Sequence, residues 1–184
     1  MMQAGYSRED RAAGGNGYVP ISLRYRPYTA DLARETSLAG GDPLEGFANR
    51  SYRGKTGCTP NESDLDLVLD TRRVMGDKPV LVMLHLERPA IVAEFEPVAD
   101  ALVVSFGVQD QALFDMLSGV AEPSGLLPIQ IPDGMTTVET QCEDLPLDMT
   151  CHCDLEGNAY DFGFGLSWSG VIRDERTARY VRHV

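Results

Sequence analysis

The chain has 184 residues, of which 43% are hydrophobic, and this is enough apolar content to build the core of one domain without disulfide bonds. Its 16 basic and 28 acidic residues give a formal net charge of −12. Because that charge repels phosphate backbones and anionic lipid surfaces, we expect neither a nucleic acid nor a membrane as a partner. No apolar run of 18 residues and no signal-peptide pattern is present, so we predict no transmembrane or secretory segment, and the localisation stays open.

Four cysteines occur at uneven spacing, too few to indicate a disulfide framework in a chain of this length. Cys142 and the triplet Cys151-His152-Cys153 could bind zinc, but they lack the paired C-x₂₋₄-C spacing of zinc sites. Cys58 stands alone. We therefore favour incidental loop cysteines and predict no metal and no cofactor.

Residues 1–62 are rich in Gly, Arg, Tyr and Pro, a composition typical of loops. Only Tyr18–Leu23 predicts a short strand, and Asp31–Leu38 could form two helical turns. No GxGxxG or Walker spacing follows a buried strand, so the glycines do not indicate a phosphate site. We predict a long, ordered surface-loop region.

A helix is predicted from Ser63, where Ser63 and Asp66 have the spacing of a capping box and Gly76 marks the end. The apolar face consists of Leu65, Val68, Leu69 and Met75.

Two unbroken apolar runs, Val80–Leu86 and Ala101–Phe106, predict strands that are covered on both faces, as in a parallel sheet. The segment Glu87–Asp100 has the length that a parallel crossover requires. His85 is interpreted as a core or strand-end histidine rather than a catalytic one. Strands of this kind, each followed by helix-forming sequence, indicate an α/β fold.

After Gly107, apolar residues at helical spacing predict a helix that packs back on the sheet: Val108, Ala112, Leu113, Met116, Leu117 and Val120. Leu126–Ile131 is predicted to be extended at a sheet margin because Pro128 and Pro132 flank it. Ser124 lacks the G-x-S-x-G pattern of a nucleophile.

Acidic residues dominate the stretch Asp133–Asn158, which predicts an irregular, solvated loop without an EF-hand pattern. The segment Tyr160–Trp168 carries four aromatic residues around glycines. We expect these aromatics to dock on the core or to line a partner surface.

Several segments together resemble the C-terminal α/β domain of glycoside hydrolase family 3, which includes many β-glucosidases. They are Gly14–Leu23, Lys78–Val82, Ala99–Leu102, Leu117–Gly119, Glu122–Pro128 and Tyr160–Leu166, and their order and spacing fit as well. The resemblance covers nearly the whole chain. It implies a three-layer α/β sandwich with a mostly parallel central sheet, which in this chain would be incomplete at the N-terminus.

In that family a (β/α)₈ barrel supplies the aspartate nucleophile, and the C-terminal sandwich supplies the acid/base glutamate. Retaining hydrolysis places two carboxyl groups about 5–5.5 Å apart across the scissile bond. A barrel takes about 250 residues, more than this chain contains. The resemblance therefore implies one wall of a site for a β-linked glucoside or oligosaccharide, with a barrel domain as the partner, and a chain that is inactive on its own.

The family's acid/base residue often lies in a Glu-Gly-Tyr/Phe-Asp-Arg pattern, and two segments approach it. Glu45-Gly46-Phe47-Ala48-Asn49-Arg50 has the glutamate but one additional residue and Asn in place of Asp. Ala4-Gly5-Tyr6-Ser7-Arg8 has the spacing but alanine at the glutamate position. Glu45 is the candidate acid/base, and a plain loop carboxylate is the alternative.

The sequence thus divides into a loop region of active-site type (1–62), the core of the family-3-like domain (63–172) and a tail (173–184). A different hypothesis is a non-catalytic carbohydrate- or protein-binding module. Its binding surface would use the aromatic residues Tyr18, Tyr25, Tyr28 and Trp168.

Overall fold

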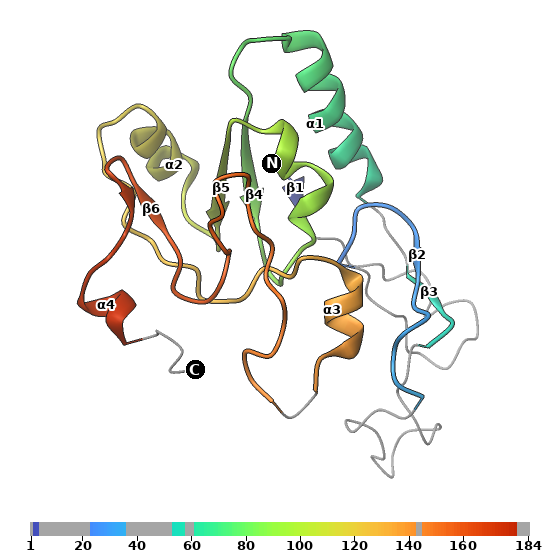
Figure 1. The fold of residues 1–184 in the computed structure, drawn as a ribbon. Coiled ribbons are helices and arrows are strands. Elements are labelled where there is room, and N and C mark those ends of the chain that lie inside the picture. The colour runs from blue at the N-terminus through green and yellow to red at the C-terminus, as the bar shows by residue number, and fades with distance from the viewer. Residues whose placement is uncertain (1, 4–22, 36–52, 58–60, 143–144, 180–184) are drawn as a thin grey trace.

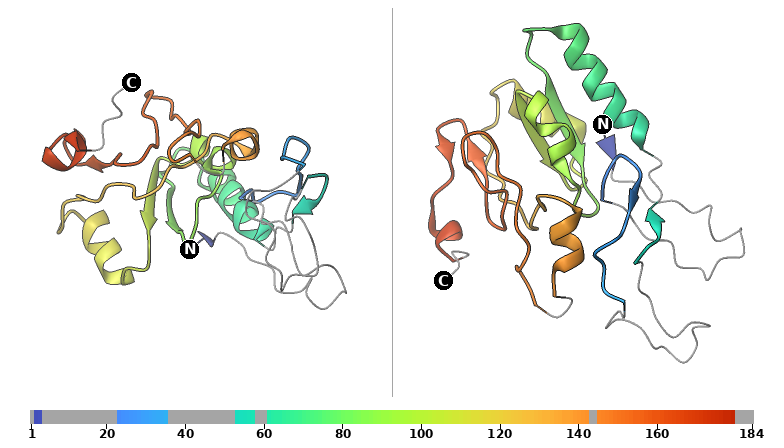
Figure 2. Two further views of the ribbon diagram at one scale, coloured as in Figure 1. Left: turned by 90° about the horizontal axis from the view of Figure 1, so that it is seen from below. Right: turned by 45° about the vertical axis from the view of Figure 1, so that its right-hand side comes forward.

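The computed structural model describes residues 2–3, 23–35, 53–57, 61–142 and 145–179. A parallel sheet lies at its centre, with helix α1 on one side of the strands and helix α2 on the other (Figures 1 and 2). This arrangement confirms the α/β fold class. None of the helices in the described ranges is long and apolar enough to span a bilayer.

The central sheet has the order β1-β4-β5, formed by Met2–Gln3, Leu81–His85 and Ala101–Ser105. Both pairs are parallel, and β4 and β5 are in register from Leu81↔Ala101 to His85↔Ser105. The two predicted strands and their parallel pairing are therefore confirmed, whereas β1 was not expected. The crossover between β4 and β5 forms two 3₁₀ turns, η2 (Val92–Glu94) and η3 (Glu96–Val98).

The prediction that both strands are covered on both faces is wrong. In β4, Val82 and Leu84 are buried, but Leu81 is 48% exposed, and no residue of Ala101–Val104 in β5 is fully buried. Among the described residues, β5 is an edge strand, and the helix beside it covers it only in part. An unbroken apolar run predicts a strand, but it does not show which other elements cover each face of that strand.

Helix α1 spans Glu62–Met75, and Leu65 and Val68 are buried on its inner face. Asn61 is its N-cap residue, without a side-chain capping bond, so the predicted capping box is wrong: Ser63 already lies inside the helix. The end is as predicted, since Gly76 has a φ of 56° that a side chain would disfavour.

Arg72 joins the end of α1 to the beginning of the strands. Its Nε donates to the Val98 carbonyl at 2.6 Å, and its Nη2 pairs with the Asp100 carboxylate. The same carboxylate accepts the Val80 amide at 2.7 Å. These bonds fix how the helix lies against the start of both strands.

Helix α2 spans Asp110–Leu117 and is shorter than predicted. Of the expected apolar face only Leu113 is buried, while Val108 is 51% and Val120 77% exposed. The prediction that this whole face packs on the sheet is therefore wrong in the described structure.

The C-terminal half pairs with the stretch that follows α2. Leu127 donates its amide to the Phe164 carbonyl at 2.7 Å, and Ile131 donates to the Tyr160 carbonyl at 3.0 Å. The stretch Leu126–Ile131 thus bonds to the segment around Tyr160–Phe164, but it is not a strand and it bends at residues 128–129. The aromatic segment docks as expected, with Tyr160 packed on the core and its ring stacked on Phe164 at 5.3 Å between centroids.

The acidic stretch after residue 132 is not wholly irregular, because α3 spans Met135–Thr140. Its threonines and valine are weak helix formers, which hid it from pattern reasoning. The remaining short elements are β2 (Tyr28–Thr29) and β3 (Thr56–Gly57), which pair antiparallel, the hairpin of β6 (Leu166–Ser167) and β7 (Gly170–Val171), and α4 (Glu175–Ala178).

Two predictions for the first 62 residues fall partly outside the described ranges. Of the expected strand Tyr18–Leu23, only Leu23 is described, and it lies in a bend. Of the expected helix Asp31–Leu38, residues 31–35 are described and are not helical. Their backbone groups bond outside the segment, since the Leu32 amide donates to the Glu139 carboxylate.

A single core lies between α1, the sheet and the crossover. It consists of Tyr25, Leu65, Val68, Val82, Leu84, Leu86, Ala90, Val92, Phe95 and Ile131. Tyr25 and Phe95 are fully buried and meet edge to face, with 5.5 Å between ring centroids. Phe95 belongs to the crossover, so the segment around Tyr25 packs directly on the link between the two main strands.

Candidate functional site

In open α/β sheets, ligands bind outside the carboxyl ends of the strands. Here the carboxyl ends of β4 and β5 point toward α3 and the β2–β3 pair (Figure 1). His85 and Ser105 are the last residues of the two strands, with His85 Nδ1 3.4 Å from Ser105 Oγ. Ser105 is buried, and a Cβ at Gly107 would lie 3.9 Å from His85 Cε1, an ordinary van der Waals distance. His85 is thus a packed strand-end histidine.

A buried carboxylate on α3 holds the β2 segment at this edge. Glu139 is 3% exposed. Its Oε1 accepts the Tyr28 hydroxyl, and its Oε2 accepts the Leu32 amide at 2.7 Å. Because Tyr28 and Leu32 come from a distant part of the chain, this one side chain holds residues 28–32 against α3.

The two described flanks of residues 36–52 lie together at the same place. Arg53 Nη1 is 3.1 Å from Glu35 Oε1, and the Ala30 amide donates to the Lys55 carbonyl at 3.1 Å. Glu45, the candidate acid/base, lies outside the described residues, as does the alternative segment 4–8.

A second carboxylate clamp lies in the crossover. Glu94 Oε1 accepts Arg24 Nε at 3.1 Å and Nη2 at 2.9 Å, and its Oε2 accepts the Tyr25 amide at 2.7 Å. Glu94 therefore holds the beginning of the described segment 23–35, and Glu139 holds its later part.

A third carboxylate belongs to a buried polar cluster. Glu96 Oε2 lies 3.0 Å from His152 Nε2, and Glu96 Oε1 accepts the Tyr160 hydroxyl at 3.3 Å. Burial and the neighbouring Glu96 charge raise the pKa of Tyr160, which therefore stays a neutral donor. His152 is 5% exposed, and its Nδ1 is 4.0 Å from Asp133 Oδ1. The cluster joins the crossover to the C-terminal half, and its acceptors are occupied by structural bonds.

The cysteine triplet does not gather ligands in the described part of the chain, where no group of three His, Cys, Asp or Glu side chains could hold a metal ion. Cys151 is buried and accepts the Gln130 amide at 3.3 Å, while Cys153 is exposed. Cys58 lies outside the described residues.

Of the four aromatic residues expected to form the surface of a binding module, the three that the structure describes do not line one surface together. Tyr25 is fully buried against Phe95, so its inclusion was wrong: the apolar ring serves the core. The Tyr28 hydroxyl is bound to Glu139, and Trp168 is 58% exposed in the β6–β7 turn. Tyr18 lies outside the described residues.

Sequence reasoning missed all three structural carboxylates, Glu94, Glu96 and Glu139. One signal was available for Glu139. Met135, Val138 and Glu139 lie at helical spacing after Gly134, so a helix there would have placed the carboxylate on the apolar face. For Glu94 and Glu96 the sequence offers no local signal, since their partners are distant.

Comparison with known proteins finds that the family description "Glycosyl hydrolase family 3 C-terminal domain" matches residues 53–168. The chain is 34% identical over 96 residues to Beta-glucosidase C of Emericella nidulans, a stretch that is 52% of this chain and 15% of that protein. It is 35% identical over 97 residues to Probable beta-glucosidase C of Aspergillus oryzae, covering 53% of this chain and 14% of the relative.

A bacterial relative, the Periplasmic beta-glucosidase/beta-xylosidase of Dickeya chrysanthemi, is 30% identical over 120 residues, which cover 65% of this chain and 17% of that protein. In each case the matched stretch is less than one-fifth of the relative. No solved structure gives a significant match. Since the family match takes in more than half of its residues, the chain belongs to the family of the glycosyl hydrolase family 3 C-terminal domain.

Proposed function

We propose that this chain forms one wall of the sugar site of a retaining β-glucosidase-like hydrolase that cleaves O-glycosidic bonds. The observation that carries this proposal is the family match over residues 53–168, and the names of the matched relatives agree with it. The substrate is a β-linked glucoside or oligosaccharide. The nucleophile comes from a (β/α)₈ barrel domain, which needs about 250 residues and so lies outside this chain.

The architecture proposed for the domain is a three-layer α/β sandwich with a mostly parallel central sheet. The parallel order β1-β4-β5 supports it, as do α1 and α2 on opposite sides of the strands (Figure 2). The division into a loop region (1–62), a core (63–172) and a tail (173–184) belongs to the same proposal.

Glu45 is the proposed acid/base residue. Its support is the family resemblance, together with the fact that the described flanks of residues 36–52 lie close together, since Glu35 and Arg53 pair and the Ala30 amide donates to the Lys55 carbonyl. In the retaining mechanism this glutamate protonates the leaving oxygen while the barrel's aspartate attacks the anomeric carbon. It then takes a proton from the water that hydrolyses the glycosyl–enzyme intermediate.

A two-component assay tests the proposal. The isolated chain should give no turnover of an aryl β-glucoside, because one of the two carboxyl groups is absent. A protein that joins the chain to a family 3 barrel domain should turn the substrate over. Robust turnover by the isolated chain would overturn the requirement for a barrel, and an inactive but folded joined protein would overturn the glycosidase proposal.

A further inference from the structure

A pocket of about 360 Å³ lies where the C-terminal segment folds over the Pro-Ser-Gly turn that follows α2. Its volume falls at the lower end of the range for small-molecule sites, about 300–1,000 Å³. Its lining comes from the turn (Glu122, Pro123, Ser124), from the β6–β7 hairpin (Ser167, Ser169, Val171) and from the lead-in to α4 (Ile172, Arg173, Arg176). The family match ends at residue 168, so much of this lining lies beyond it.

The walls of this pocket are held close together by backbone. A Cβ at Gly165 would lie 2.2 Å from the Gly125 carbonyl oxygen, so the hairpin approaches the turn as closely as glycine permits. The Ile172 amide donates to the Gly165 carbonyl at 2.9 Å, which positions the lead-in to α4 on the same support. These two contacts hold the walls of the pocket in place.

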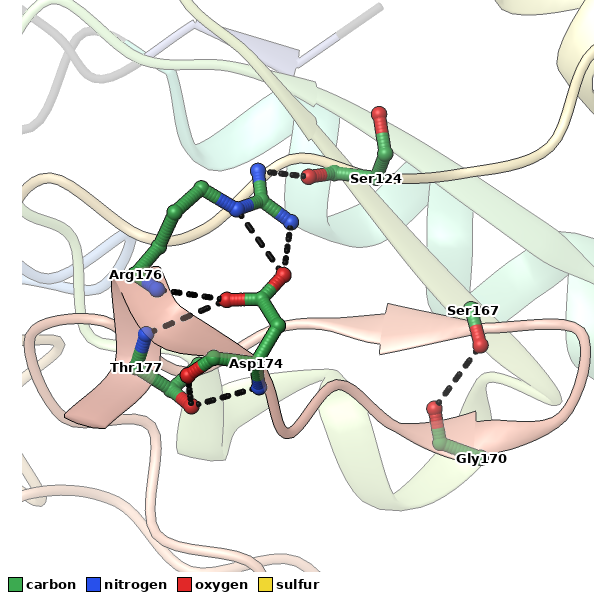
Figure 3. A network of polar contacts seen from close by, with 6 residues as sticks. All are labelled: Ser124, Ser167, Gly170, Asp174, Arg176 and Thr177. Atoms are coloured by element: carbon green, nitrogen blue, oxygen red, sulfur yellow. Dashed lines mark hydrogen bonds and ion pairs between the residues drawn. The ribbon is translucent and has the colours of Figure 1, made fainter.

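The Arg176 guanidinium lines one side of the pocket, which is open to solvent (Figure 3). Arg176 Nη1 donates to the Ser124 carbonyl at 2.8 Å, while Nε and Nη2 donate to Asp174 Oδ2 at 2.9 and 2.7 Å. Asp174 also caps α4, since its Oδ1 accepts the Arg176 amide at 2.8 Å. The side chain is thus aimed by contacts on both sides of the guanidinium.

The lining combines hydrogen-bond donors, acceptors and groups that serve as either. Arg173 and Arg176 donate, the Glu122 carboxylate accepts, and three serine hydroxyls do both. Ser167 Oγ lies 2.8 Å from Ser169 Oγ and donates to the Gly170 carbonyl at 3.3 Å, so the hairpin itself holds the Ser167 hydroxyl (Figure 3). Asp174 pairs with Arg176, and Glu122 offsets Arg173, so the charges around the pocket balance. Such a lining suits the hydroxyl groups of a neutral ligand better than an anion.

We propose that this pocket binds one or two units of a neutral saccharide, at a site separate from the carboxyl edge of the sheet. The hairpin and α4 lie across the central sheet from the β2–β3 pair, so the two sites face different parts of the molecule (Figure 1). The site does not depend on the proposed hydrolase activity.

Titration calorimetry on the whole chain tests this site, with cellobiose as the probe and inorganic phosphate as a separate arm. Arg173→Ala removes a lining donor and should weaken cellobiose binding about tenfold, the effect of one charge-assisted hydrogen bond. Arg179→Ala removes an arginine from the same terminal segment outside the lining and should leave the affinity unchanged. Glu45→Gln should also leave it unchanged, which separates this site from the proposed catalytic one.

Three results would overturn the inference. The first is that cellobiose gives no saturable heat. The second is that phosphate binds saturably in place of the sugar. The third is that Arg173→Ala and Arg179→Ala lose affinity equally.

A circular-dichroism melt of each variant verifies folding. Ser169→Ala removes one lining hydroxyl and is a milder second variant, which should also weaken cellobiose binding.

Discussion

Replacing Glu139 should loosen the β2 segment more than any exposed substitution on α3. In Glu139→Leu the Tyr28 hydroxyl and the Leu32 amide lose their shared acceptor in a site that is 3% exposed. Each hydrogen bond to a charged group contributes about 1.5–3 kcal/mol. Removing a buried carboxylate and adding an apolar side chain offset part of that loss. We therefore expect a net loss of about 2–4 kcal/mol in the free energy of unfolding, within the range of broken buried networks.

The assay is thermal unfolding followed by circular dichroism, together with amide hydrogen exchange at Leu32. For a chain of this size about 1 kcal/mol corresponds to about 2–4 °C, so Tm should fall by about 4–16 °C. The Leu32 amide should exchange faster. Glu139→Gln should cost only about 1 kcal/mol, because its carbonyl can accept the Leu32 amide while its NH₂ donates to the Tyr28 oxygen.

Thr136→Leu is the matched control, since Thr136 is an exposed residue of the same helix and should change stability by no more than about 0.5 kcal/mol. If Glu139→Leu unfolds at the wild-type temperature and the Leu32 amide keeps its exchange rate, Glu139 does not hold the β2 segment.

Three further substitutions probe the core, the Pro-Ser-Gly turn and the strand starts. The Tyr25 hydroxyl is buried and has no hydrogen-bond partner among the described residues, so Tyr25→Phe should leave stability unchanged or raise it by up to about 1 kcal/mol in a urea titration; a clear loss would reveal a partner. Gly165→Ala should destabilise by about 1–3 kcal/mol, because the new Cβ would meet the Gly125 carbonyl oxygen, whereas Gly125→Ala, with no atom within 4 Å of the new Cβ, should be nearly neutral. The Val80 amide and the Arg72 side chain lower the pKa of Asp100 below its usual 3.8, so this carboxylate stabilises the fold above the unfolded-state value and the contribution is lost as pH falls through the lower folded-state value. Asp100→Asn should therefore flatten the acid limb of a stability–pH curve, and an unchanged acid limb would show that the pairing contributes nothing.

The sequence was sufficient for the elements whose signals are local. The apolar runs around Val82 and Val103 and the crossover between them predicted a parallel pair, and Gly76 marked the end of α1 correctly. What covers each strand was not predictable, because Leu81 and Val82 read alike in sequence although one is exposed and the other buried. Burial depends on elements that lie far away in the chain.

The carboxylate contacts at the candidate site could not be predicted for the same reason. Glu139 binds Tyr28 across 111 positions, and Glu94 binds Arg24 across 70. No periodicity connects residues at such separations, and each carboxylate alone has the pattern of a solvated charge. The proposed role of Glu45 rests on the family resemblance.

The most direct test of the central claim compares leaving groups in the joined enzyme that carries Glu45→Gln. A general acid accelerates departure of a poor leaving group by about 10²–10⁴-fold, and a good leaving group needs little protonation. Glu45→Gln should therefore lose most activity toward an alkyl β-glucoside and keep most of the glycosylation rate toward a dinitrophenyl β-glucoside. Glu156→Gln, which alters an exposed glutamate of the C-terminal half, should retain both activities. Equal rates for Glu45→Gln and the unaltered enzyme on both substrates would contradict the assignment of Glu45 as the acid/base residue.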